Sequence, residues 1–225
     1  MTHKILCALL AAALLPGVLN AQTSGAKRAV AEKVTEEAGE RLSYTYVQAG
    51  YNFDTQVNTV GSGPGSLEGD GDGYAVQASY DLTPTIHMLG DYNSVSAEPD
   101  GGGNDQDLQR VRAGFGLHSE SGANADNSYF LNLTYERYDF DQVSVGNGFG
   151  FEAGWRHGFT GEYLSRLELD LSVQYIDLDD DALLDNEIGA RGQLLYDLTQ
   201  RFALFLSYED NQILEETRVG LRAYF

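Results

Sequence analysis

Residues 166–175 read RLELDLSVQY, and every second residue of this stretch is apolar. Successive side chains of a β-strand point to opposite faces, so one face of this stretch carries Leu167, Leu169, Leu171, Val173 and Tyr175. The opposite face carries Arg166, Glu168, Asp170, Ser172 and Gln174. One fully apolar face and one charged face predict a strand that lies between two environments of very different polarity.

The same alternation recurs along almost the whole chain after residue 41. Other apolar series start near residues 47, 74, 86, 111, 129, 149, 188, 202 and 217, with turn-forming Gly, Pro, Asp and Asn between them. The pattern predicts about ten strands of roughly 10 to 16 residues, close to the length that crosses a bilayer at a tilt. Eight strands are the alternative, if two of the shorter segments are loops.

We therefore expect an all-β fold, a transmembrane antiparallel up-and-down β-barrel. A soluble β-sandwich would show a similar alternation. The barrel is favoured because aromatic residues gather at strand ends, because the polar faces carry acids and arginines in mid-strand, and because the chain starts with an export signal. No segment after that signal has the long apolar run of a transmembrane helix. In the first of the strands, beginning near residue 46, Gln48, Asn52 and Asp54 are expected on the polar face.

Residues 1–21 are typical of a secretory signal peptide. Lys4 provides the positive start, residues 5–15 the apolar segment, and Ala21 a small residue before the expected cleavage point. Cleavage after Ala26 is a second possibility, since Leu19 is not the small residue usually found there.

The rest of the chain divides into two parts. Residues 22–41 lack strand character and are expected to form a periplasmic arm, and residues 42–225 are expected to form the barrel. The predicted location is the cell outer membrane.

Charge and cysteine content exclude several classes of function. The net charge of -20 argues against a nucleic-acid partner, because no basic surface is available to neutralise phosphates. The single cysteine, Cys7, lies in the signal peptide, so neither a disulfide nor a thiolate metal site is expected in the mature chain. No cofactor is expected.

The polar faces predict a charged barrel interior. Enclosed charges must be paired, because their desolvation is costly. The expected interior charge network consists of Arg110, Arg112, Glu136, Glu152, Arg156, Arg166, Glu168, Asp170, Glu187, Arg191, Arg218 and Arg222. The favoured interpretation is a salt-bridged filling that holds the barrel in shape. A charged channel for ions or small solutes is the alternative, and inward glycines favour it by leaving space, at Gly50, Gly114, Gly116, Gly150, Gly154, Gly189 and Gly220.

Neither catalytic nor metal-binding spacing is found. The mature histidines are His87, His118 and His157, and none is placed at the outer rim beside a carboxylate. The acidic segment from Asp177 lacks the glycine and glutamate that a calcium-binding EF-hand loop requires at its sixth and twelfth positions. We therefore expect no enzyme and no metal site, and a structural or surface-interaction role.

Two stretches carry a family resemblance. LSYTYVQAGY (42–51) and GYAVQASYDLTPTIHMLGDY (73–92) are similar to small outer-membrane barrels of the OmpA/OmpX-like group, and most similar to a family of short barrels from xanthomonads and related gammaproteobacteria. The resemblance implies an outer-membrane location, with lipid and lipopolysaccharide as partners, and it identifies no activity or oligomeric state.

The stretch RVGLRAYF (218–225) resembles the signal by which outer-membrane barrels are recognised by the barrel-assembly machinery. Arg218, Gly220, Ala223 and Phe225 fill the polar, glycine, hydrophobic and aromatic places of that signal. The assembly machinery is thus an expected partner during biogenesis.

Overall fold

The structure is a computed structural model. It describes residues 42–57, 69–99, 105–119, 126–140, 144–160, 164–179, 187–211 and 213–225. The expected signal peptide and periplasmic arm lie outside the described residues.

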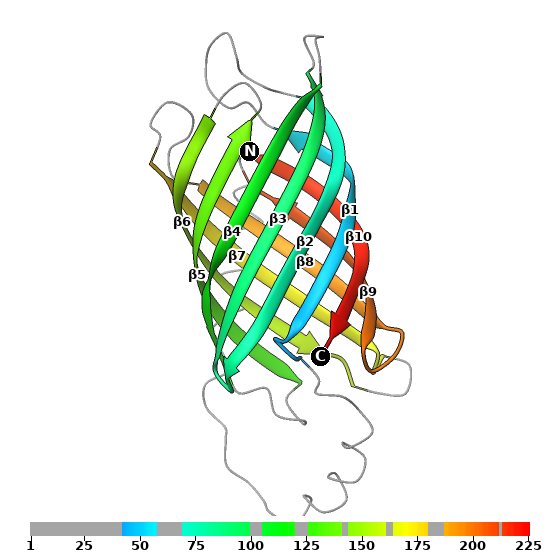
Figure 1. Ribbon diagram of the computed structural model, residues 1–225. Coiled ribbons are helices and arrows are strands. Elements are labelled where there is room, and N and C mark those ends of the chain that lie inside the picture. The colour runs from blue at the N-terminus through cyan, green and yellow to red at the C-terminus, as the bar shows by residue number, and fades with distance from the viewer. Residues whose placement is uncertain are drawn as a thin grey trace, which may run out of the picture.

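Ten strands follow one another along the chain. Their bounds are β1 (Tyr46–Val57), β2 (Gly69–Thr83), β3 (Ile86–Pro99), β4 (Gln106–His118), β5 (Asn127–Phe140), β6 (Ser144–Gly158), β7 (Leu167–Leu178), β8 (Glu187–Asp197), β9 (Phe202–Asp210) and β10 (Leu214–Tyr224). Each strand pairs antiparallel with its neighbours in the sequence, and β1 pairs with β10 to close the barrel (Figure 1). The predicted all-β antiparallel barrel is confirmed, with ten strands rather than eight.

The closing pair joins the two ends of the predicted strand series. Gln48 of β1 lies opposite Arg222 of β10, and Gly50 lies opposite Gly220. Closure leaves no unpaired sheet edge, and this is what a β-structure needs in order to cross a bilayer.

The barrel is apolar outside and polar inside. Large exposed hydrophobic side chains cover the outer surface, among them Tyr51, Val76, Met88, Phe115, Leu133, Phe151, Ile188, Leu194, Leu206 and Leu221. The alternate positions are buried and mostly polar, as in the β7 series Glu168, Asp170, Ser172 and Gln174. Apolar side chains gain nothing from facing water, so this exterior is suited to lipid.

No helix among the described residues has the length and hydropathy needed to cross a membrane.

The pairing of β1 with both of its neighbours shifts between Asn52 and Thr55. Phe53 and Asp54 are both exposed, and the inward alternation resumes at Thr55. An inserted residue of this kind moves every later side chain to the other face. Asp54 therefore lies outside, although simple alternation placed it on the polar face.

The two ends of the barrel are named here by the strands that reach them. The terminus end holds Tyr46, the first residue of β1, and Tyr224, the last residue of β10, and it is the lower end in Figure 1. The far end holds Val57, Leu214 and the ends of the other odd-numbered strands.

Candidate functional site

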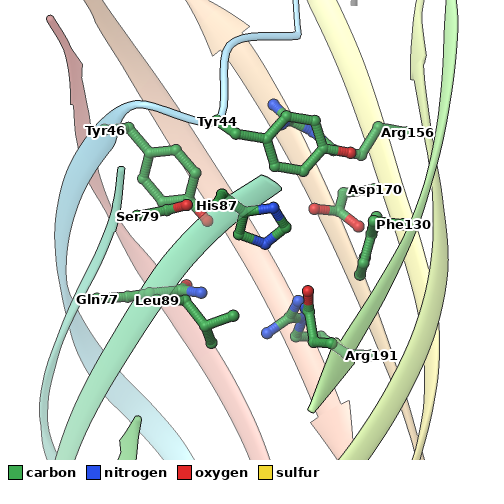
Figure 2. A pocket seen from close by; sticks show the side chains of 11 residues that line it. Tyr44, Tyr46, Gln77, Ser79, His87, Leu89, Phe130, Arg156, Asp170 and Arg191 are labelled. Carbon is green, nitrogen blue, oxygen red and sulfur yellow. The ribbon is translucent and has the colours of Figure 1, made fainter. Parts of the chain in front are cut away.

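The terminus end of the interior is filled by residues that precede β1. Tyr44 is buried, and its ring stacks on His118 with 4.0 Å between ring centroids and on His87 with 4.9 Å (Figure 2). Its hydroxyl lies 3.0 Å from the Ser128 hydroxyl. Burial raises the pKa of the Tyr44 phenol to about 12, so the ring is uncharged at physiological pH. The tyrosine acts as an aromatic cap over this end.

Arg156 attaches that cap to the barrel wall. Its guanidinium lies 4.6 Å from the centre of the Tyr44 ring, and it donates a hydrogen bond of 3.1 Å to the Ser43 carbonyl. From β6 it also reaches Glu168 of β7, with its Nε 2.8 Å from the carboxylate. One buried cation thus links two strands to the segment before β1, using the fork geometry that only arginine offers.

Arg222 occupies the adjacent position on β10. It donates to Gln48 at 2.8 Å and to Gln193 at 2.6 Å, and its guanidinium lies 4.0 Å from the centre of the Tyr46 ring. Glu168 is 3.8 Å away. The strand that closes the barrel is therefore held to β1 and β8 by side chains as well as by the backbone.

Glu152 of β6 is the centre of the next group. Arg191 of β8 lies 2.7 Å from one of its oxygens and Arg112 of β4 lies 3.9 Å from the other. Ser172 donates to Glu152 at 2.7 Å and Asn132 donates at 2.9 Å. Side chains of four other strands, β4, β5, β7 and β8, thus meet at one buried carboxylate of β6, and its charge is matched on both sides.

A further ion pair crosses the interior. Arg110 of β4 lies 2.6 Å from Glu209 of β9, two strands that are far apart in the sheet, and 3.4 Å from Asp91 of β3. Gln174 also donates to Glu209 at 3.0 Å. Side chains from opposite walls of the barrel therefore meet across the interior.

Toward the far end, Arg218 pairs with Glu216 on the same strand and donates to Asn52 at 2.7 Å. Asn93 of β3 donates to Glu216 at 2.7 Å. This group joins β1, β3 and β10 within the interior.

Beyond these polar groups, the interior becomes apolar. A buried cluster is formed by Val57, Val95, Ala97, Leu108, Tyr138, Ile176, Leu178, Ile213 and Leu214. This layer contrasts with the charged interior beside it, because it offers few polar partners to water or ions. The charged middle of the barrel therefore lies between an apolar layer and the Tyr44 cap.

The inward glycines do not leave the expected space. A Cβ atom built on Gly154 would collide with the Phe130 ring, and one on Gly150 would collide with the Glu136 carboxylate. At Gly50 the neighbouring side chains are Arg218 and Phe205. The glycines make room for large interior side chains, so their interpretation as empty volume was wrong at these positions.

A small cavity lies near the terminus end. Its lining includes Tyr44, His87, Asp170 and Arg191, with Asp170 on the wall facing His87 (Figure 2). Its volume of about 20 Å³ is room for one or two water molecules. One oxygen of Asp170 has no hydrogen-bond partner among the described residues, so the cavity is suited to an ordered water.

The predicted interior residues divide into three groups. Those buried inside the barrel, or largely so for Arg191, are Arg110, Arg112, Glu136, Glu152, Arg156, Glu168, Asp170, Arg191, Arg218 and Arg222. Arg166 is exposed in the turn before β7, so its placement in the interior was wrong: the strand starts one residue later, at Leu167. For Glu187, the first residue of β8, the structure describes the backbone and not the side chain.

Three interior carboxylates were not singled out from the sequence. Asp91, Glu209 and Glu216 are buried and take part in the ion pairs and hydrogen bonds above. Alternation along β3, β9 and β10 puts all three on the polar face, and this signal was available for each of them.

The structure also brings together three residues that the sequence did not connect. One carboxylate oxygen of Asp81 and one ring nitrogen each of His87 and His118 all lie within 4.8 Å of one another. Asp81 lies near the end of β2 and His87 near the start of β3, two strands joined by a two-residue turn, while His118 ends the neighbouring β4. No carboxylate partner at the outer rim is expected for these histidines from the sequence, and the partner that the structure shows lies at the terminus end.

In the comparisons with known proteins, the matches are to solved structures. Neither a protein-family model nor a curated protein matches the sequence. The structure is similar to the "KdgM porin in complex with disordered oligogalacturonate", with a TM-score of 0.41 and 10% identity over 80% of this chain and 99% of that one. It is similar to Neisserial surface protein A (TM-score 0.40, 17% identity, 81% and 98% covered) and to OprG from Pseudomonas aeruginosa (0.39, 9%, 84% and 97%).

The location follows from the fold and its surface. The barrel is closed, its exterior is apolar and its polar side chains are turned inward. Closed barrels of this kind are the β-structures that span membranes, and they do so in the outer membrane of bacteria. The chain is an outer-membrane β-barrel.

Proposed function

We propose that the protein is a closed outer-membrane barrel with a structural or surface-interaction role, rather than a channel or an enzyme. The observation that carries this proposal is the ion pair between Arg110 and Glu209, which joins opposite walls at 2.6 Å. The apolar cluster on one side and the Tyr44 cap on the other support the same conclusion. In this role, the interior charge network fixes the shape of the barrel.

The far end offers the surface for such an interaction. The half-buried or exposed carboxylates described there are Asp54, Asp70, Asp72, Glu98, Asp105, Asp107, Asp139, Asp177, Asp179, Asp210 and Glu215. Of the residues described at this end, Arg137 is the one exposed cation, and it is paired with Asp139 at 2.8 Å. An acidic rim of this kind attracts cationic partners and divalent ions that bridge to lipopolysaccharide.

The orientation and biogenesis belong to the same proposal. The terminus end faces the periplasm, as in bacterial barrels with an even number of strands. Phe225 and Ala223, with Gly220 and Arg218, serve as the assembly signal, and the similarity to the OmpA/OmpX-like barrels of xanthomonads fits this assignment.

A narrow channel for ions or small solutes is the second candidate. The cavity beside Asp170 and Arg191 favours it, because it is a polar space next to the terminus end.

Liposome swelling separates the two candidates. Vesicles containing the folded protein are expected to swell in a small sugar no faster than protein-free vesicles, because the interior pairs exclude solute. A general porin reconstituted at the same density serves as the positive control. Swelling at a rate that rises with the amount of this protein would overturn the closed-barrel proposal.

A further inference from the structure

Three ligand-type atoms converge at the terminus end. They come from the ends of three adjacent strands, β2, β3 and β4, and each lies within 4.8 Å of the other two. Neutral imidazole nitrogens and a carboxylate oxygen are a preferred donor set for divalent transition metals, and for Zn²⁺ in particular.

His118 is oriented as a metal ligand would be. Its Nδ1 lies 3.1 Å from the backbone carbonyl of Ser119, which accepts hydrogen bonds only, so Nδ1 carries the proton. In the neutral ring, Nε2 then presents a bare lone pair to Asp81, whose carboxylate oxygen is 3.0 Å away. Two acceptors facing each other need a cation between them or an added proton. A ring N–H bound to a backbone carbonyl is the arrangement that holds metal-ligating histidines in place.

His87 adds a second, independent observation. Its side chain is buried, and its Nδ1 has no hydrogen-bond partner among the described residues. A buried polar nitrogen without a hydrogen-bond partner lowers the stability of the fold. A metal ion bound by a nitrogen of this ring would provide a partner. Ligand atoms around a tetrahedral zinc ion lie about 3.3 Å apart, so closing the site requires a side-chain movement of about 1 Å.

The surroundings suit a site with limited access. Tyr44 stacks on both imidazoles, and Figure 2 shows its ring above His87. The Asp81 side chain is 26% exposed, and it provides the route from the aqueous side. Trp155 and His157 lie on the outer face of β6, away from this cluster.

We propose that Asp81, His87 and His118 form a site for a divalent transition metal, with Zn²⁺ as the fitting ion and water in the remaining coordination position. The bound ion joins the ends of β2, β3 and β4 directly beneath the Tyr44 cap. It thereby strengthens the closure of the barrel at the end where the chain enters it. The site does not depend on whether the barrel conducts.

The test is a metal titration of the full mature protein, refolded in detergent micelles without a histidine tag and stripped with chelator. Calorimetry is expected to show one Zn²⁺ bound per chain at neutral pH, and weaker binding at pH 5.5, because protons compete for the imidazoles. Co²⁺ in the same site is expected to give visible absorption bands of a low-coordinate nitrogen- and oxygen-bound ion. Mg²⁺ and Ca²⁺ are not expected to compete, since they prefer oxygen ligands.

Variants assign the binding to the cluster. Asp81→Asn, His87→Gln and His118→Gln are each expected to weaken Zn²⁺ binding by about 100-fold or more, as loss of a direct ligand should exceed the 10- to 100-fold effect of outer-shell partners. His157→Gln, which changes a half-buried histidine on the outer face, is expected to leave binding unchanged. Folding of each variant is checked by its heat-dependent shift on gels.

Three outcomes overturn the proposal: no Zn²⁺ binding by the folded wild-type chain, binding that persists in all three cluster variants, or binding that is lost in His157→Gln. If a cluster variant fails to fold, Co²⁺ absorption of the wild-type protein still decides the matter, because an octahedral, water-like spectrum would contradict imidazole ligation.

Discussion

Replacement of Glu152 by leucine is expected to lower the free energy of unfolding by about 3–5 kcal/mol. Glu152 is the carboxylate between Arg191 and Arg112, and it also accepts hydrogen bonds from Ser172 and Asn132. Its removal leaves two buried guanidinium groups without their shared partner. Urea unfolding in micelles, followed by the fluorescence of Trp155, the single tryptophan of the chain, measures the loss.

The matched control is Glu98→Leu, because Glu98 is an exposed carboxylate on β3. This change is expected to alter the free energy of unfolding by less than about 0.5 kcal/mol. The double variant Glu152→Leu/Arg191→Met is expected to recover part of the lost stability, since it removes one of the uncompensated charges. Equal unfolding curves for Glu152→Leu and Glu98→Leu would show that the interior pairs are dispensable.

Replacement of Arg156 by methionine is expected to have an effect of similar size and to loosen the terminus end. The substitution leaves Glu168 buried without its closest cation, and it removes the hydrogen bond to the Ser43 carbonyl and the contact with the Tyr44 ring. We expect a loss of about 3–5 kcal/mol and faster hydrogen exchange of the backbone amides of residues 42–46.

Arg156→Lys is expected to restore little of the lost stability and amide protection, because one ammonium group cannot reach the Glu168 carboxylate and the Ser43 carbonyl at once. Arg166→Met is the control, since Arg166 is exposed in the neighbouring turn. Hydrogen–deuterium exchange with mass spectrometry compares the variants. Protection of residues 42–46 that is the same in Arg156→Met and wild type would argue against Arg156 as the anchor of the cap.

Much of the fold could be predicted from alternation alone. The series from Leu167 to Tyr175 identifies a strand with a lipid face and an interior face, and its repetition gives the barrel. Prediction failed where the period was interrupted. The bulge that turns Asp54 outward changes the register within β1, and the local sequence pattern does not predict it. Arg166 was misplaced because a strand boundary one residue further along moves the side chain into a turn.

The candidate site was harder to predict, because it depends on contacts across the barrel. Alternation places Arg110 and Glu209 inside, but it does not say that they meet from opposite walls. Asp81, His87 and His118 become neighbours through the pairing of β2, β3 and β4, and single-strand patterns carry no such information. The glycines were misread for the same reason: their empty faces are filled by side chains of other strands, such as Phe130 at Gly154.

Single-channel recording in a planar bilayer tests the central claim, that the interior is closed, most directly. The folded wild-type protein is expected to insert without producing unitary current steps, because the Tyr44 cap, the ion pairs of Arg110 and Glu152, and the apolar cluster at the far end lie in series along the interior. A general porin added to the same bilayer shows that steps can be detected. Stable unitary steps from the wild-type protein, reduced or altered by Arg112→Met, would contradict the account and identify a channel.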